Sequence, residues 1–127
     1  MNEPAPAPTE IRLHKKSRYL ELVYASGESF SLPCEYLRVF SPSAEVRGHG
    51  PGQEVLMVGK ENVSIVAIEP VGRYAVRLKY SDGHDSGLYT WQYLQELGRE
   101  KETNWQSYLD RLAEVSYVRK IPDEVSE

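Results

Sequence analysis

Two polar stretches of the chain hold the residue types that bind ligands or carry out chemistry. One covers residues 37–50 (LRVFSPSAEVRGHG) and the other covers residues 80–91 (YSDGHDSGLYTW). Both are rich in Ser, Gly, His and charge, and both adjoin apolar, strand-like runs. Because loops held by a rigid scaffold commonly carry binding and catalytic groups, these two stretches are the candidate site.

The second stretch places Asp82, His84 and Asp85 within four consecutive positions. Imidazole and carboxylate groups together can ligate a divalent metal or transfer protons near neutral pH. With His49 from the first stretch they would form an oxygen- and nitrogen-rich site that suits iron(II), manganese or zinc. The alternative is a polar hairpin turn, since Asp-Gly is a favoured turn pair with Ser or Asp beside it. The residues leave both interpretations open.

The first stretch could instead hold an anion. Its candidate binding residues are Arg38, Ser41, Ser43, Glu45 and Arg47. Two guanidinium groups and the backbone N–H groups of a Gly-rich loop can hold a phosphate or carboxylate through forked hydrogen bonds. In the alternative, Arg38 pairs with Glu35 or Glu45, and the glycines only allow the chain to turn.

Several enzyme signatures are missing from the sequence. Six residues rather than four separate Gly52 from Gly59, and Glu61 stands where a phosphate-binding P-loop has Ser or Thr. None of the three histidines is followed two positions later by Asp or Glu, as in the iron sites of many oxygenases. No Gly-x-Ser-x-Gly elbow occurs either. These absences favour a non-catalytic protein over an enzyme.

Cys34 is the lone cysteine of the chain. It excludes an internal disulfide and favours a reducing compartment, so the sequence predicts a cytoplasmic protein. Cys34 follows Pro33 at an expected helix start, where the helix dipole could lower the pKa of the thiol. The alternative is that Cys34 is a small buried apolar residue.

The length and composition indicate one soluble globular domain. The 127 residues can bury a single modest core, and 40% of them are hydrophobic while 27% are charged. The net charge of −4 argues against nucleic acid and anionic membranes as partners. No apolar stretch approaches the roughly 20 residues that span a bilayer, and the acidic, Pro/Ala-rich start is not a signal peptide.

Period-two alternation predicts the strands that position the two stretches. A strand at residues 10–14 should precede a hairpin of residues 18–24 and 28–32. A second hairpin should join residues 63–68 to residues 73–80 through a turn at Glu-Pro-Val-Gly, with Tyr74, Val76, Leu78 and Tyr80 on one face. A short strand should follow around Leu88.

Helices are predicted between and after these strands. A short helical turn should follow Pro33. Thr90 should cap a helix that Gly98 ends. Thr103 and Gln106 match a capping box, and an amphipathic stripe follows at Trp105, Tyr108, Leu109 and Leu112. The stripe should pack on the chain's own core, although docking on a second copy would make a homodimer.

This order of elements predicts an α+β fold, in which antiparallel β-hairpins form a β-rich module followed by C-terminal helices. Three segments are expected. Residues 1–9 should form a flexible tail, residues 10–98 the module, and residues 99–127 a C-terminal amphipathic helix and tail.

At LRVFSPSAEVRGHG and SDGHDSGLYTWQYL the chain resembles the gamma-butyrobetaine hydroxylase-like N-terminal domain, a family with small, stand-alone bacterial members. The resemblance covers about residues 10 to 98. In the hydroxylases that name the family, the module precedes a separate 2-oxoglutarate/iron oxygenase domain, and a similar module is attached to some P-loop iron–sulfur carrier proteins. The resemblance therefore implies an accessory or interaction module linked to metal or iron–sulfur metabolism, with a metalloenzyme or iron–sulfur carrier as its partner.

The resemblance also implies where a metal site of the family would fall in this chain. In those hydroxylases the module binds zinc through three cysteines and one histidine. The histidine falls on His84, and the cysteines fall on Ser41, Ser43 and Val46. Hydroxyl groups and a valine cannot replace zinc-binding thiolates, so the family's zinc site is largely lost here. We expect the loop of residues 41–49 still to lie beside His84.

Overall fold

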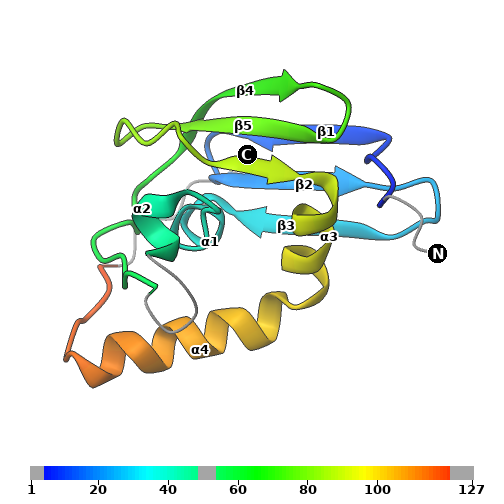
Figure 1. Ribbon diagram of the computed structural model, residues 1–127. Coiled ribbons are helices and arrows are strands. Elements are labelled where there is room, and N and C mark those ends of the chain that lie inside the picture. The colour runs from blue at the N-terminus through cyan, green and yellow to red at the C-terminus, as the bar shows by residue number, and fades with distance from the viewer. Residues whose placement is uncertain (1–4, 49–53, 121–127) are drawn as a thin grey trace.

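The fold is a mixed α+β arrangement, seen here in a computed structural model that describes residues 5–48 and 54–120 (Figure 1). The described strands are β1 (Glu10–His14), β2 (Tyr19–Val23), β3 (Ser29–Pro33), β4 (Ile65–Val71), β5 (Ala75–Tyr80) and β6 (Leu88–Thr90). The described helices are α1 (Cys34–Val39), α2 (Ala44–Arg47), α3 (Trp91–Arg99) and α4 (Lys101–Glu114). Strands therefore come before the long helices, which confirms the predicted fold class.

Some sequence predictions fall outside these described residues. They concern His49 and the glycines at positions 50 and 52, the first four residues of the N-terminal tail, and residues 121–127 of the C-terminal tail.

The first sheet is antiparallel, with the strand order β1-β2-β3. Leu20 pairs with Leu32 and Leu22 pairs with Phe30 across the predicted hairpin. Leu20, Leu22 and Leu32 are all buried, because residues two apart in a strand point to the same face. Gly27 supplies the left-handed backbone of the connecting turn, with a φ of 92°.

The second sheet, β4-β5-β6, is also antiparallel, and its turn lies later than the sequence predicted. Pro70 pairs with Val76 inside the sheet, and the chain turns at Gly72, whose φ is 60°. A proline is tolerated there because β4 is an edge strand. Tyr74 consequently lies at the turn and is 65% exposed, whereas Val76, Leu78 and Tyr80 are buried on one face of β5, the face predicted for them.

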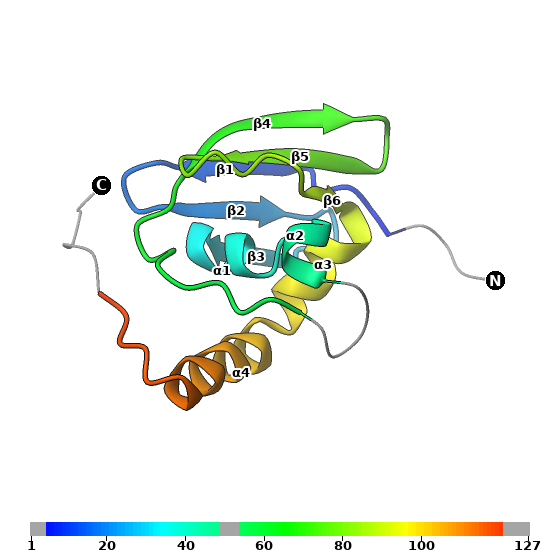
Figure 2. The same cartoon turned by 60° about the vertical axis from the view of Figure 1, so that its left-hand side comes forward.

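Both sheets and α3 share one hydrophobic core. Its members include Leu22 and Leu32 from the first sheet, Leu78 from the second and Leu94 from α3. Figures 1 and 2 both show α1 and α2 lying between the sheets and α4. The core thus holds the ends of β3 and β5, from which the two polar stretches emerge.

The predicted start of α3 is confirmed and its predicted end is wrong. The Thr90 hydroxyl accepts a hydrogen bond from the backbone N–H of Tyr93 at 3.0 Å. The helix continues through Gly98 to Arg99. The position needs a glycine because of packing and not because the helix ends there. A Cβ atom at Gly98 would lie 2.4 Å from Cγ of Phe30.

Helix α4 begins at Lys101, so Thr103 lies inside it and the predicted capping box is wrong. The amphipathic stripe packs on the chain's own residues. Tyr108 and Leu112 are buried with Val39, and Trp105 and Leu109 pack against this second cluster. The Tyr108 hydroxyl also donates to the backbone oxygen of Met57 at 2.6 Å.

The segment of residues 117–120 runs back over the molecule after α4. Arg119 forms an ion pair with Glu35 of α1, and its guanidinium carbon lies 5.1 Å from the centre of the Trp105 ring. The Tyr117 hydroxyl and the backbone N–H of Lys120 each donate to Oε2 of Glu61 at 2.8 Å. Both carboxylates are buried, and these contacts supply partners for Glu35 and for Oε2 of Glu61.

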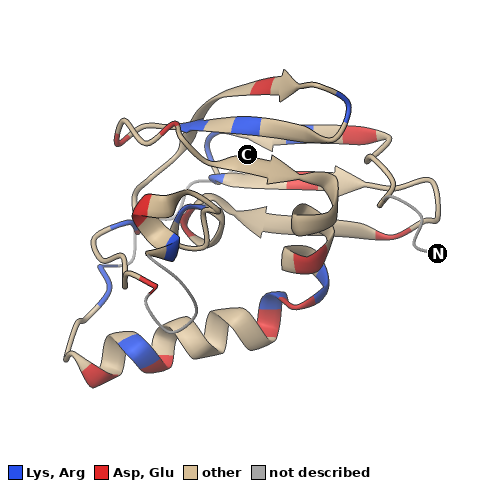
Figure 3. Cartoon of the chain, viewed as in Figure 1, with Lys and Arg blue, Asp and Glu red and all other residues tan. Residues whose placement is uncertain are grey.

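Charges of both signs are spread over the molecule. Figure 3 shows basic and acidic residues on both sheets and on α4. Among the described residues, no helix is both long and apolar enough to cross a membrane.

Candidate functional site

The two polar stretches of the sequence lie side by side. The first becomes the end of α1, a turn and α2, and the second becomes the loop between β5 and β6. Ser43 caps α2 by accepting a hydrogen bond from the backbone N–H of Glu45 at 3.2 Å. Ser43 also contacts the second stretch, since its Oγ lies 2.8 Å from Oγ of Ser86. The expected proximity of the two loops is therefore confirmed for the described part of the first.

His84 lies at the centre of this contact and is 6% exposed. Its Nε2 is 2.9 Å from Oγ of Ser41, and its Nδ1 is 3.1 Å from Oε2 of Glu45. Because a carboxylate only accepts hydrogen bonds, Nδ1 carries a proton and donates to Glu45. In the neutral ring, Nε2 then accepts from the Ser41 hydroxyl. We call Ser41, His84 and Glu45 the His84 bridge.

The His84 bridge has the connectivity of a Ser–His–carboxylate triad, but its serine is not placed for attack. Ser41 is 1% exposed. Its Oγ accepts the backbone N–H of Ser43 at 3.3 Å, and a Cβ atom at Gly87 would lie only 2.5 Å from it. A nucleophile must reach its substrate, so the bridge fastens two loops together rather than presenting a reactive oxygen.

A charged cluster adjoins the bridge. Nε of Arg38 donates to Oδ2 of Asp82 at 2.9 Å, and Nζ of Lys60 donates to the same oxygen at 2.6 Å. The backbone N–H of His84 donates to Oδ1 of Asp82 at 3.2 Å. Partial burial opposes ionisation of Asp82, but the bonds from Lys60, His84 and Arg38 outweigh it and lower its pKa to about 2.

The partners predicted for Arg38 were wrong. Glu35 pairs with Arg119, and Glu45 pairs with His84, so Arg38 uses Asp82 instead. The Arg38 side chain is 5% exposed, and its Nη1 has no hydrogen-bond partner among the described residues.

The predicted metal ligands do not converge in the described structure. The Asp82 carboxylate is held by Arg38 and Lys60, Asp85 is exposed, and both ring nitrogens of His84 have partners within the His84 bridge. Within residues 5–48 and 54–120, no group of three or more His, Cys, Asp and Glu side chains is placed to hold a metal ion. His49, the fourth predicted ligand, lies outside these residues.

The zinc site that the resemblance implies does not fit the side chains present. Ser41 places its hydroxyl directly on the imidazole nitrogen of His84, and Ser43 bonds to Ser86. Val46 is apolar and buried. Zinc sites of this type need thiolates at such positions, so we assign no role to zinc in this chain.

Cys34 behaves as a buried apolar residue. It is fully buried in the main core, and burial raises the pKa of its thiol. The lowered pKa that a helix start could produce is therefore not found.

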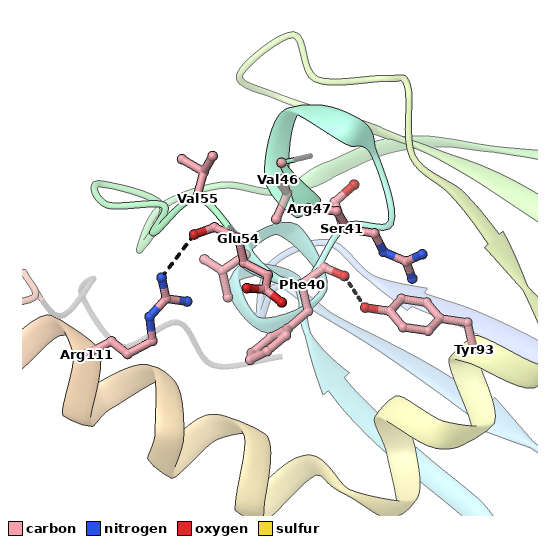
Figure 4. Close-up of a pocket in the computed structure, with 10 residues that line it drawn as sticks. Phe40, Ser41, Val46, Arg47, Glu54, Val55, Tyr93 and Arg111 are labelled. Carbon is pink, nitrogen blue, oxygen red and sulfur yellow. Dashed lines mark hydrogen bonds between the residues drawn. The ribbon is translucent and has the colours of Figure 1, made fainter. Parts of the chain in front are cut away.

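A pocket of about 650 Å³ opens on the other side of α2 (Figure 4). It is lined by Val39, Phe40, Ser41, Val46, Arg47, Gly48, Glu54, Val55, Tyr93 and Arg111. The guanidinium carbon of Arg47 lies 4.9 Å from the centre of the Tyr93 ring. The Tyr93 hydroxyl donates to the backbone oxygen of Phe40 at 2.5 Å. Burial raises the pKa of this hydroxyl, which keeps it a donor.

The two arginines predicted to share one anion are separated by the fold. Arg38 faces Asp82 in the loop cluster, whereas Arg47 faces Tyr93 in the pocket. The sequence did not single out Tyr93 and Arg111, because each fits an ordinary helical pattern. Only the packing of α3 and α4 brings them to the first polar stretch.

Comparison with known proteins places these features in a family. The family model described as gamma-butyrobetaine hydroxylase-like, N-terminal, matches residues 11–95. The match covers both polar stretches and ends within α3. No curated protein matches the chain.

Three solved structures are similar over most of the chain. Two were determined by NMR in solution, and both have a TM-score of 0.78. One is 49% identical, covering 95% of each chain, and the other is 45% identical, covering 100% of this chain and 97% of its own. The third is the crystal structure of a DUF971-family protein of unknown function from Acidithiobacillus ferrooxidans. It is 41% identical with a TM-score of 0.63, covering 76% of this chain and 98% of that one.

Proposed function

Because the chain belongs to the gamma-butyrobetaine hydroxylase-like N-terminal family, we propose that it is an accessory module that binds another protein and does not itself catalyse a reaction. In this proposal the partner is a metalloenzyme or an iron–sulfur carrier, in line with the proteins to which similar modules are attached. The proposal also has the protein act in the cytoplasm, where the lone Cys34 would stay a free thiol.

The observation that carries this proposal is the way the two polar loops are fastened. Ser41 and Glu45 each contact His84, Ser43 contacts Ser86, and Arg38 contacts Asp82. A surface that is already ordered loses little conformational entropy when a partner binds. Function therefore rests on a preformed shape rather than on a reactive group.

The surface over these loops is polar and hollowed. A depression of about 250 Å³ is lined by Arg38, Glu45, Lys60, Asp82, Gly83, His84, Asp85 and Ser86. Glu45 and Asp85 are exposed at this depression, whereas the cations Arg38 and Lys60 are tied to Asp82. The accessible charge is thus acidic, and it would steer a basic patch of the partner toward the loops.

Reversing the charge at Asp85 tests the proposal. Tagged wild-type protein and the Asp85→Arg variant would be used to isolate bound proteins from the source cells, with quantification by mass spectrometry. The protein that Asp85→Arg loses would then be purified and its dissociation constant measured by calorimetry. We expect at least about tenfold weaker binding by the variant, which corresponds to about 1.4 kcal/mol.

Glu102→Arg is the matched control, because Glu102 is an exposed acid on α4. It should bind like the wild type. Equal affinities of all three proteins for the purified partner would contradict the proposed surface, provided that each variant melts like the wild type.

The second candidate function is metal binding at His84. It would require the exposed Glu45 carboxylate and Nδ1 of His84, now 3.1 Å apart, to exchange their mutual hydrogen bond for a metal ion. Elemental analysis of untagged protein, paired with melting curves with and without a chelator, separates the two functions. A ligand that binds only the folded state raises stability. Near-stoichiometric metal with a chelator-sensitive melt would favour the metal site, and an unchanged melt would favour the interaction module.

A further inference from the structure

We propose that the pocket between α2, α3 and α4 binds a small organic carboxylate with an apolar body, and that one of its two arginines, Arg47 or Arg111, holds the carboxylate group. This inference goes beyond the accessory function proposed above, which uses the loop cluster on the other side of α2. It identifies a second binding site in the same molecule.

The walls of the pocket suit an apolar body. Val39 and Val46 are buried at its inner side, and Phe40 and Val55 complete the apolar lining. Figure 4 shows Phe40, Val46 and Val55 around the cavity, with Arg47 and Arg111 on different sides of it. The volume of about 650 Å³ lies within the range of roughly 300–1,000 Å³ that is typical of small-molecule sites.

Two arginines line the pocket, and neither has a carboxylate partner among the described residues. Seven other cations have carboxylate partners: Arg12, Arg38, Lys60, Arg77, Lys79, Arg99 and Arg119. Among the described residues, Arg47 and Arg111 have none. Six more cations also lack one, at positions 15, 16, 18, 73, 101 and 120, but they do not line the pocket. Arg47 stacks on the ring of Tyr93, and Arg111 donates to the backbone oxygen of Glu54 at 3.3 Å.

These contacts hold the arginines without neutralising them. The position of Arg47 over the Tyr93 ring orients its planar guanidinium and cancels none of its charge. A backbone oxygen uses one N–H of Arg111 and cancels no charge. Glu54 also lines the pocket, so the lining carries two cations and one anion. The net charge of +1 matches a single carboxylate better than a multiply charged phosphate ester.

The ligand class follows from the apolar walls of the pocket and from the arginines beside them. A fully polar anion would leave the valine and phenylalanine walls exposed, and a neutral apolar molecule would leave both guanidinium groups without a partner. A monocarboxylate with an aliphatic or aromatic body satisfies both requirements.

Backbone amide NMR spectra of the ¹⁵N-labelled full chain test the proposal directly. Octanoate is the probe, and octan-1-ol is the uncharged probe of the same length. We expect saturable octanoate shifts at Gly48, Val55, Tyr93 and Arg111, with octan-1-ol binding at least about tenfold more weakly because it cannot form the charge-assisted bonds.

Two variants separate the charged half of the site from the apolar half. Arg47→Gln/Arg111→Gln should weaken octanoate about tenfold or more and leave octan-1-ol unchanged. Val55→Trp should weaken both probes by filling the cavity. Arg77→Gln/Arg99→Gln is the matched control, because it removes two arginines that lie outside the pocket, and it should bind octanoate like the wild type.

Three outcomes would overturn the proposal. They are octanoate shifts that do not saturate, saturable shifts that map to the loop cluster around His84 instead of the pocket, and equal affinities for octanoate and octan-1-ol. Well-dispersed spectra of every variant confirm that each is folded. A negative octanoate result would not contradict the proposed accessory function, because Asp85, the residue that tests that function, does not line this pocket.

Discussion

At the scale of single residues, the side chain of His84 finds both of its hydrogen-bond partners in the neighbouring loop. Ser41→Ala removes the buried partner of Nε2. We expect this variant to lose about 1–3 kcal/mol of unfolding free energy, because a buried polar atom left without a partner keeps its full desolvation cost. Urea unfolding measures the change.

The control for that substitution is Ser107→Ala at an exposed position of α4. It should change the unfolding free energy by no more than about 0.5 kcal/mol. A loss at Ser41 as small as the change at Ser107 would show that the His84 bridge does not stabilise the fold.

Asp82 makes stability depend on pH at the acidic end. Its folded-state pKa of about 2 lies below its ordinary value of 3.8. A depressed pKa stabilises the protein above the unfolded-state pKa, and this contribution is lost as the pH falls from about 4 toward 2. Asp82→Asn should therefore cost at most about 2 kcal/mol at pH 7 and flatten the stability curve between pH 4 and 2.

Urea unfolding of the wild type and Asp82→Asn at a series of pH values from 7 to 2 tests this dependence. Asp85→Asn is the control, since Asp85 is an exposed acid of the same loop. Its curve should run parallel to that of the wild type. Parallel curves for Asp82→Asn would contradict the assignment of the lowered pKa.

The sequence predicted part of the site and missed the rest for a physical reason. The proximity of residues 41–48 to His84 followed from the motifs of a family, and the hydrogen bond between Ser41 and His84 bears it out. The partner of Arg38 could not be predicted, because three acids were within plausible reach. Which one it uses depends on the loop geometry after β5.

At the scale of elements, α3 carries a glycine in its interior. Replacing an exposed helical glycine with alanine usually stabilises a protein by roughly 1 kcal/mol. We expect Gly98→Ala to destabilise this protein by about 1–3 kcal/mol, because the new methyl group would overlap three ring atoms of Phe30 at 2.4–2.7 Å.

A double-mutant cycle with Phe30→Ala separates the two effects. In the Phe30→Ala background the overlap is absent, so Gly98→Ala should become stabilising through helix propensity alone. The same sign in both backgrounds would show that Phe30 moves aside easily.

Strand prediction succeeded where burial alternates along the chain and failed where two turn signals compete. Residues 18–24 and 28–32 alternate cleanly, and their hairpin forms as expected. At the second hairpin, Pro70 suggested a turn, but Gly72 supplied the positive φ that fixed it two residues later. The end of α3 was misjudged for a similar reason, because the sequence does not show that Gly98 faces Phe30.

At the scale of the whole molecule, α4 attaches to the body through the cluster of Val39, Tyr108 and Leu112. Leu112→Ala should cost about 2–5 kcal/mol by leaving a cavity in this small cluster. Urea unfolding measures the loss, and light scattering should give the mass of one chain for both proteins. A wild-type mass of two chains that falls to one in Leu112→Ala would show instead that the stripe holds a second copy.

The contacts of residues 117–120 with Glu35 and Glu61 have a consequence for folding during synthesis. The strands, α1 and α3 leave the ribosome before residues 117–120 do, yet both acids have their partners among these late residues. A nascent chain that has formed both sheets would still hold two carboxylates without their partners. We therefore expect the nascent chain to keep this side open and hydrated until residues 117–120 emerge.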